Sequence, residues 1–126
     1  MRLLVDSHVA LWWLDGHDSL GPRSRDRVER ADEVYFSAVT PWELGIERSL
    51  GKISFPDGLA DALIEAGLLA LDISSHDAEA AAALPLHHRD PFDRMLVAQA
   101  RRHVLEIMSA DAALSAYDVG VIDASS

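Results

Sequence analysis

The stretch LLVDSHVALWWL, residues 3–14, decides the fold. It opens with a short apolar run that ends at Asp6, and apolar residues return from Val9 to Leu14. This pattern predicts a buried first strand that feeds directly into a helix. Because Asp6 and His8 interrupt the stretch and Asp15 stops it, it is too short and too polar for a membrane span or a secretory signal.

The rest of the chain repeats this alternation of strand and helix. Further strands are predicted at residues 34–36, 68–73, 104–108 and 119–122. Helices are predicted from Pro22, from Asp90-Pro91, and over residues 57–67, 77–84 and 111–116. Another helix should open at Thr40, with Glu43 completing a capping box. We therefore expect one α/β domain over residues 1–126, with a central parallel sheet and helices on both faces.

The composition limits the class of protein. The 126 residues, of which 49% are hydrophobic, suffice for one domain with a real core. The chain has no cysteine, so disulfides, thiolate zinc sites and cysteine nucleophiles are excluded. This composition fits a reducing cytoplasm, and no segment of the sequence predicts a membrane location.

The formal net charge of −10 counts against binding a polyphosphate by simple electrostatic attraction. A cluster of carboxylates, however, becomes a phosphate site once divalent cations fill it. Arginine, the better bidentate phosphate ligand, also dominates the basic residues. Eight arginines fall in two groups, which solvated helix faces would explain equally well: Arg23, Arg25, Arg27 and Arg30, and Arg89, Arg94, Arg101 and Arg102.

Four carboxylates follow predicted strands or open predicted helices: Asp6, Glu43, Asp93 and Asp111. In an open parallel sheet, such positions gather at the carboxyl ends of the strands, where the fold forms its crevice. Helix capping and the helix dipole explain each acid taken singly. They do not explain why acids recur at several junctions that should meet in space. The sequence therefore predicts a carboxylate cluster.

A cluster of oxygen ligands suits a hard cation such as Mg²⁺ or Mn²⁺. Two such ions, about 3.5–4 Å apart, can activate a water and stabilise the leaving oxygen of a phosphodiester. The hypothesis that follows is hydrolysis of phosphodiester bonds by metal-activated water.

Four segments together resemble VapC-type PIN-domain toxins of bacterial toxin–antitoxin pairs. They are LLVDSH at 3–8, SAVTPWEL at 37–44 with LGKI at 50–53, HRDPFDR at 88–94 with QA at 99–100, and SAD at 109–111. Each segment alone is weak, but four of them in the family's order, over nearly the whole chain, are specific.

The resemblance implies a Rossmann-like α/β/α sandwich, usually a homodimer, that cleaves RNA with Mg²⁺ or Mn²⁺ and is silenced by a VapB-type antitoxin. Carried over by position, Asp6 and Asp93 would be the principal metal ligands. Glu43 would complete the first metal site, and Asp111 would be a fourth acid. Thr40 matches a small hydroxyl residue that often lines the site. A basic antitoxin segment would suit such an acidic crevice, because its arginine could pair with the carboxylates.

The segment at 88–94 leaves two alternatives open. Asp90 and Asp93 compete for the role of metal ligand, and capping geometry favours Asp90 as the helix N-cap, with Pro91 at the first helical position and Asp93 as the ligand. Arg94 would either orient carboxylates or hold phosphate.

Two other positions bear on substrate recognition. Glu47 stands where relatives commonly carry lysine, which leaves the substrate preference in doubt. His87 and His88 lack the helical spacing of a zinc pair, so we expect them in a loop near the substrate.

Functions of other classes fit less well. A non-catalytic PIN-like module that binds RNA or protein would keep the fold without metal binding, and retention of all four acids tells against it. A receiver domain would carry a lysine late in the sheet, whereas Lys52 is the only lysine here. A dinucleotide-binding enzyme would need glycine after the first strand, where this chain has Asp6-Ser7-His8.

Overall fold

The computed structural model describes residues 1–126 and contains a five-stranded sheet surrounded by helices. The strands are β1 (Arg2–Val5), β2 (Glu33–Ser37), β3 (Leu69–Leu71), β4 (Glu106–Ser109) and β5 (Val121–Asp123). The helices are α1 (Ser7–Asp15), α2 (Pro22–Arg30), α3 (Val39–Ser49), α4 (Leu59–Glu65), α5 (Ser75–Ala83) and α6 (Pro91–His103), followed by the short 3₁₀ helix η1 (Ala112–Ala116).

The sheet has the strand order β3-β2-β1-β4-β5, and every neighbouring pair is parallel. Leu4 of the central strand β1 pairs with Tyr35 of β2 on one side and with Ile107 of β4 on the other. The chain order therefore reverses between β1 and β4, which is where an open parallel sheet forms its crevice. The α/β class expected from the sequence is confirmed.

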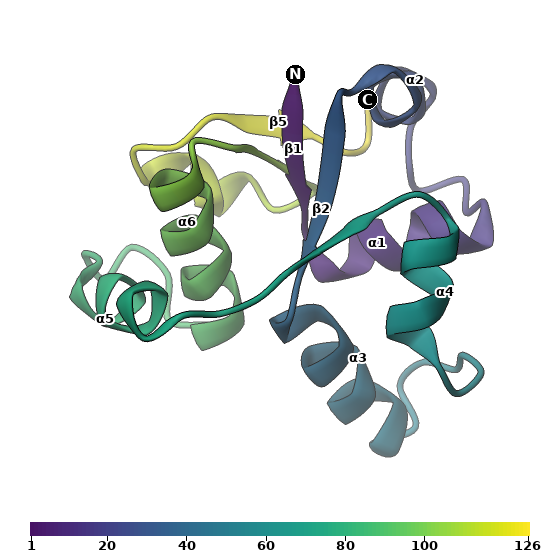
Figure 1. Cartoon of the computed structure of the whole chain (residues 1–126), viewed down its shortest axis with the longest axis horizontal. Helices are drawn as coiled ribbons and strands as arrows, with labels where there is room; N and C mark the ends of the chain where they lie inside the picture. Colours follow the sequence, from purple (N-terminus) through teal and green to yellow (C-terminus); the bar gives the residue numbers. More distant parts are fainter.

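The two faces of the sheet are covered by different helices. Side chains alternate across β1, so that Leu3 and Val5 join one apolar core and Leu4 joins the other. Helices α5 and α6 lie on one side of the strands, and α1, α2 and α4 lie on the other (Figure 1). Burial of each such leucine or valine contributes about 1.5–3 kcal/mol, so this alternation fixes both the register and the layers.

Several element bounds differ from those expected. The fourth strand begins at Glu106 because Val104 still belongs to the end of α6, where it adopts a left-handed conformation with φ 56°. The N–H of Leu105 then donates to the carbonyl of Ala100 at 2.8 Å and completes the end of the helix. Separately, none of the helices has both the length and the apolar character that a membrane crossing requires.

Candidate metal centre

The candidate site lies at the carboxyl ends of β1 and β4, the point at which the strand order reverses. Asp6 follows β1 directly, and its backbone N–H donates to the carbonyl of Met108 in β4 at 3.0 Å. Ser109 ends β4, and Asp111 follows two residues later. The central strand pair thus brings together two acids that are far apart in the sequence.

Asp6 is held firmly in this crevice. It caps α1, since its Oδ1 accepts from the N–H of Val9 at 2.9 Å. Its Oδ2 accepts from the hydroxyl of Ser109 at 2.5 Å. Burial nevertheless raises the pKa of Asp6 above its usual value, and these two hydrogen bonds oppose the rise.

Helix α6 carries the next acid into the site. Asp90 is its N-cap, with Oδ1 accepting from the N–H of Phe92 at 2.8 Å, and Pro91 occupies the first helical position. The capping geometry expected for Asp90 is therefore confirmed. Asp93 lies in the first turn, free to face the other carboxylates.

The pKa of Asp93 is strongly raised. Its pKa rises from 3.8 to about 7, first because burial disfavours its charge and then because Asp90, Glu43 and Asp6 repel it. The neighbouring His88 acts in the opposite direction. Asp6 and Glu43 thus influence Asp93, but Asp6, Glu43 and Asp93 do not form a group whose ligand atoms all lie within 4.8 Å of one another, so the cluster of four acids stays a prediction.

The capping box expected at Thr40 and Glu43 is wrong. Helix α3 begins at Val39, with Ala38 as its N-cap and no side-chain capping bond; the N–H of Val39 donates to the hydroxyl of Ser37 at 3.1 Å. Thr40 is buried inside the helix, and its hydroxyl lies 3.1 Å from that of Ser7. Glu43 is therefore beyond the first turn and free of any capping role.

The pKa of Glu43 is also raised, chiefly by burial and further by the charges of Asp90 and Glu47. A hydrogen bond with the Ser7 hydroxyl and the charge of His8 act against this rise. The hydroxyl of Thr40, which was expected near the site, contacts the hydroxyl of Ser7. Its link to Glu43 is therefore indirect, through Ser7. Glu47 lies 3.2 Å from Nε2 of His8 and adds another negative group beside the cluster.

Asp111 differs from the other three acids. It caps η1, with Oδ1 accepting from the N–H of Ala113 at 2.9 Å, and its Oδ2 lies 3.0 Å from Nε2 of His88. The bond from Ala113 and then the contact with His88 hold its pKa below the usual value. The negative charge of Asp111 is thus stabilised by hydrogen bonds, and the residue lies at the edge of the site, with 43% of its side chain exposed.

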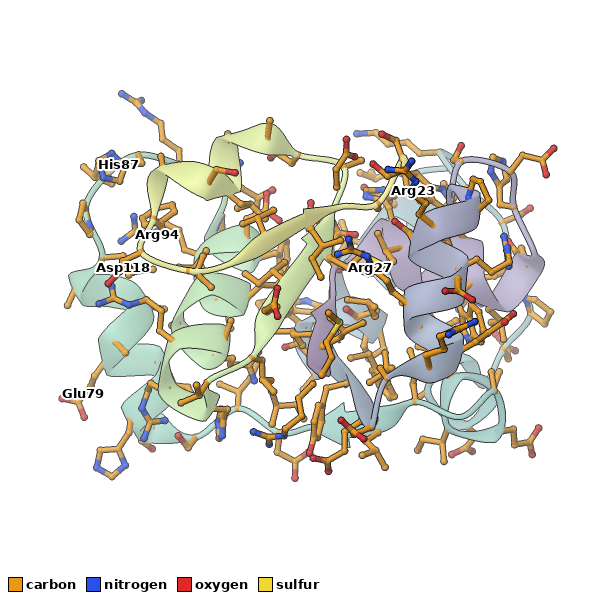
Figure 2. The ribbon with its side chains drawn as sticks, turned by 90° about the horizontal axis from the view of Figure 1, so that it is seen from above. Arg23, Arg27, Glu79, His87, Arg94 and Asp118 are labelled. Atoms are coloured by element: carbon orange, nitrogen blue, oxygen red, sulfur yellow. The ribbon has the colours of Figure 1, made fainter.

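The roles considered for Arg94 have no support in its contacts. Its guanidinium donates to the carbonyls of Ala81 and Leu84, both at 2.9 Å, and to that of Pro85 at 3.0 Å. These carbonyls lie at and just beyond the end of α5, where the negative end of the helix dipole attracts a cation. Arg94 therefore ties α6 to α5 and lies, with His87, on the opposite side of the molecule from Arg23 and Arg27 of α2 (Figure 2).

Three further polar residues belong to the site: Ser7 and Ser109, which were not predicted, and His88, which was expected only in a loop near the substrate. Ser7 and Ser109 orient Glu43 and Asp6, and both are buried. His88 bridges the acids, since its Nε2 lies 3.1 Å from Oδ2 of Asp93 and 3.0 Å from Oδ2 of Asp111. The only sequence signal for them is their closeness to the acids along the chain.

The donor set fits a hard divalent cation. Burial raises the pKa of Asp6, Glu43 and Asp93, and the charges of Asp6 and Glu43 raise that of Asp93 further. One ligand atom from each of His88, Asp93 and Asp111 also lies within 4.8 Å of the others. Oxygen ligands of this kind are those that Mg²⁺ and Mn²⁺ prefer.

Comparison with known proteins agrees with this geometry. The chain is 29% identical to ribonuclease VapC22 of Mycobacterium tuberculosis (strain ATCC 25618 / H37Rv), over an alignment of 123 residues that covers 91% of each protein. Its fold is similar to that in VapBC2 from Rickettsia felis bound to a promoter DNA fragment, with a TM-score of 0.70, 12% identity and 98% of each chain covered. It is also similar to a chain of FitAcB from Neisseria gonorrhoeae, with a TM-score of 0.64, 21% identity and 96% of each chain covered.

The sequence model of the PIN domain matches residues 3–120. This match spans β1 to the residue before β5, and so includes all four acids and the central crevice. The resemblance seen in the sequence is confirmed, and the chain belongs to the PIN domain family.

Proposed function

We propose that the chain, as a single PIN domain, is a Mg²⁺- or Mn²⁺-dependent endoribonuclease toxin of the VapC type that hydrolyses RNA phosphodiester bonds. The observation that supports the proposal is that burial and the charges of Asp90, Glu43 and Asp6 raise the pKa of Asp93 to about 7, beside a group of His88, Asp93 and Asp111 whose ligand atoms lie within 4.8 Å of one another. Three acids that repel one another destabilise the fold, and a bound divalent cation removes that cost. The name of the relative VapC22 supports ribonuclease activity, and a cytoplasmic location would give access to RNA.

In this proposal, Asp6 and Asp93 are the principal metal ligands, Glu43 completes the site, and Asp111 is the fourth acid. A bound Mg²⁺ or Mn²⁺ would supply the activation of a water and neutralise charge on the phosphodiester. The chain supplies position: Ser109 fixes Asp6, Ser7 fixes Glu43, and the first turn of α6 fixes Asp93. Such orientation of ligands by neighbouring hydrogen bonds commonly affects metal affinity 10- to 100-fold.

Cleavage of purified RNAs tests the nuclease directly. The chain is freed of partners and assayed with Mn²⁺, with Mg²⁺ and with chelator, beside Asp6→Asn and Asp93→Asn. Asp57→Asn is the matched control, because the Asp57 side chain is 98% exposed on the surface. Metal-dependent cleavage that is lost in the two site variants and kept in the control is the expected result.

The alternative is a non-catalytic PIN-like module that binds RNA or protein. It keeps the fold and predicts no cleavage, and it gives no reason for three acids with raised pKa values to be held together. Calorimetric titration with Mn²⁺ separates the two. Failure of the chain to bind Mn²⁺ would favour the module.

We further propose a VapB-type antitoxin partner whose basic segment pairs with the acids. The similar structures are described as a VapBC2 assembly and as a toxin–antitoxin complex from Klebsiella pneumoniae, the latter with 18% identity, a TM-score of 0.66 and 95% of each chain covered. Arginine on carboxylate gives strong, charge-assisted hydrogen bonds. Expression with the neighbouring small open reading frame should yield a stable complex whose inhibition weakens when arginines of the partner become alanine.

A homodimer is the assembly that we propose. Trp42, Ile46 and Leu50 are exposed on successive turns of α3, with exposed fractions of 63%, 39% and 65%. An apolar stripe of this kind is typical of a protein interface. Sedimentation should give twice the 13.8 kDa mass of one chain, and Leu50→Glu should shift the protein toward the monomer.

A further inference from the structure

His88, whose imidazole lies between Asp93 and Asp111, is not one of the metal ligands expected from the sequence. His88 lies between α5 and α6, and 20% of its side chain is exposed. Its Nε2 lies within hydrogen-bond distance of both Asp93, in α6, and Asp111, in the turn after β4. It is therefore the one side chain that joins the two acids of this half of the site.

The other ring nitrogen identifies the tautomer. Nδ1 of His88 accepts from the backbone N–H of Asp90 at 3.1 Å, so it carries no proton. The proton of the neutral ring must then be on Nε2, where it is donated to Oδ2 of Asp111. If Nε2 bound a metal instead, the proton would move to Nδ1 and face the N–H of Asp90. The geometry thus disfavours His88 as a metal ligand.

Tyr117 also holds the backbone of His88 in place. The backbone N–H of His88 donates to the hydroxyl of Tyr117 at 2.9 Å, and that hydroxyl donates to the carbonyl of Pro85 at 2.9 Å. Tyr117 is buried, with 5% of its surface exposed. This anchor limits the freedom of the loop and keeps Nε2 directed at the acids.

The two carboxylates are left in different states by this bridge. Both oxygens of Asp111 have donors, Ala113 on Oδ1 and His88 on Oδ2. Oδ2 of Asp93 lies 3.1 Å from Nε2 of His88, and neither oxygen of Asp93 accepts a hydrogen bond in the structure. Asp93 is therefore the acid of the pair with an oxygen available to a cation.

We propose that His88 is a positioning residue: by donating its Nε2 proton to Asp111 while Nε2 lies against Asp93, it holds the two acids side by side and leaves the oxygens of Asp93 available to the metal. This inference rests on the proposed metal-dependent function, but the hydrogen bond itself does not need a metal. Because outer partners of metal ligands typically affect affinity 10- to 100-fold, the expected effect is of that size.

The first test reads the tautomer by ¹⁵N NMR of the imidazole in the full chain, without added metal. A neutral ring with its proton on Nε2 is expected near neutral pH. A proton on Nδ1 would overturn the proposal, whether or not the chain is a nuclease. Conversely, the expected tautomer in a chain that binds no Mn²⁺ would retain the hydrogen bond and reject the proposed function.

The second test measures the Mn²⁺ dissociation constant by calorimetry. His88→Ala should raise it about 10- to 100-fold, and His88→Gln, which keeps an N–H donor, should recover much of the loss. His87→Ala is the matched control, because the exposed neighbour His87 touches the ring of Tyr117 but none of the acids, and it should change the constant less than about twofold. Equal affinity in wild type and His88→Ala would refute the role.

A third test, by spectroscopy, distinguishes this arrangement from one in which His88 itself binds the metal. Nitrogen coupling to bound Mn²⁺ in pulsed electron paramagnetic resonance is expected to be absent, because His88 donates to Asp111. A coupling that disappears in His88→Ala would show the ring to be a ligand and would overturn the proposal.

Discussion

Asp77 and Asp93 occupy the same place in two neighbouring helices and have opposite properties. Each is the third residue of its helix, α5 and α6 respectively, and each is largely buried, with exposed side-chain fractions of 1% and 18%. Yet the pKa of Asp77 lies below its usual value, whereas that of Asp93 rises to about 7.

The difference lies in the neighbours of the two acids. Burial raises the pKa of both, but Asp77 accepts from the N–H of Ser74 in a capping box and pairs with Arg102. Asp93 instead faces other carboxylates. A buried acid at a helix start is thus structural when it has donors and a candidate functional group when it has like charges.

The largest expected effect separates the two acids by activity. Asp93→Asn should lower the rate of RNA cleavage at least about 100-fold, because it removes a proposed metal ligand. Asp77→Asn should stay within a few-fold of wild type at a temperature well below its melting point. Initial rates with Mn²⁺ on one RNA substrate measure both. A greater loss in Asp77→Asn would reverse the assignment of roles.

Stability should show the opposite ranking. Asp77→Ala removes the capping box and leaves Arg102 without its partner, so we expect the free energy of unfolding to fall by about 2–3 kcal/mol. Asp93→Asn removes a repelled charge and should raise it by about 2 kcal/mol at pH 8 in chelator. Urea denaturation of the three proteins provides the values. A loss of stability in Asp93→Asn would mean that its charge is compensated.

The pH dependence sharpens the same contrast. The pKa of Asp93 is higher in the folded protein than in the unfolded chain, so the folded state binds this proton more tightly. The resulting contribution to the free energy of unfolding is fully present below about pH 4 and is lost as the pH rises through 7. Asp77 has a lowered pKa, so its contribution is present at neutral pH and is lost on acidification. Wild type should therefore lose about 2 kcal/mol relative to Asp93→Asn between pH 4 and 8 in chelator. A constant difference across this range would contradict the raised pKa.

The smallest effect concerns the charge around the acids. Glu47→Lys replaces an acid that contacts His8 by the residue common in relatives, and should improve cleavage at low RNA concentration by a few-fold. The gain should shrink as salt is added, since screening removes long-range attraction. Rates at low and high ionic strength measure it, with Asp57→Lys as a control for net charge.

The strands of the sheet, and the local surroundings of three of the four acids, were predictable from the sequence. Both depend on the pattern of residues next to one another along the chain. Short apolar runs identified every strand, and the segments between them, in which apolar residues recur at helical spacing, identified helices. Asp90-Pro91 marked the start of α6 at the correct residue. Parallel topology then brought Asp6 and Asp93 to one edge of the sheet without further information.

What the sequence did not reveal depends on contacts across the chain. Thr40 and Glu43 match a capping box, but α3 begins earlier, at Val39, and the buried hydroxyl of Thr40 contacts Ser7 from the start of α1 instead. His88 looks like an ordinary loop residue until the fold places it between Asp93 and Asp111. Val104 has strong strand propensity, yet the turn that ends α6 imposes a left-handed backbone on it.

The position of β1 at the centre of the sheet has a consequence for the timing of folding. Leu4 is synthesised long before its partner Ile107, at roughly 5–20 residues per second of translation. A nascent chain that stops before Ser109 already contains Asp6, Glu43 and Asp93, but it lacks the strand that holds Asp6. The site can therefore be completed only after β4 has been synthesised, and a nascent chain without β4 carries an incomplete site.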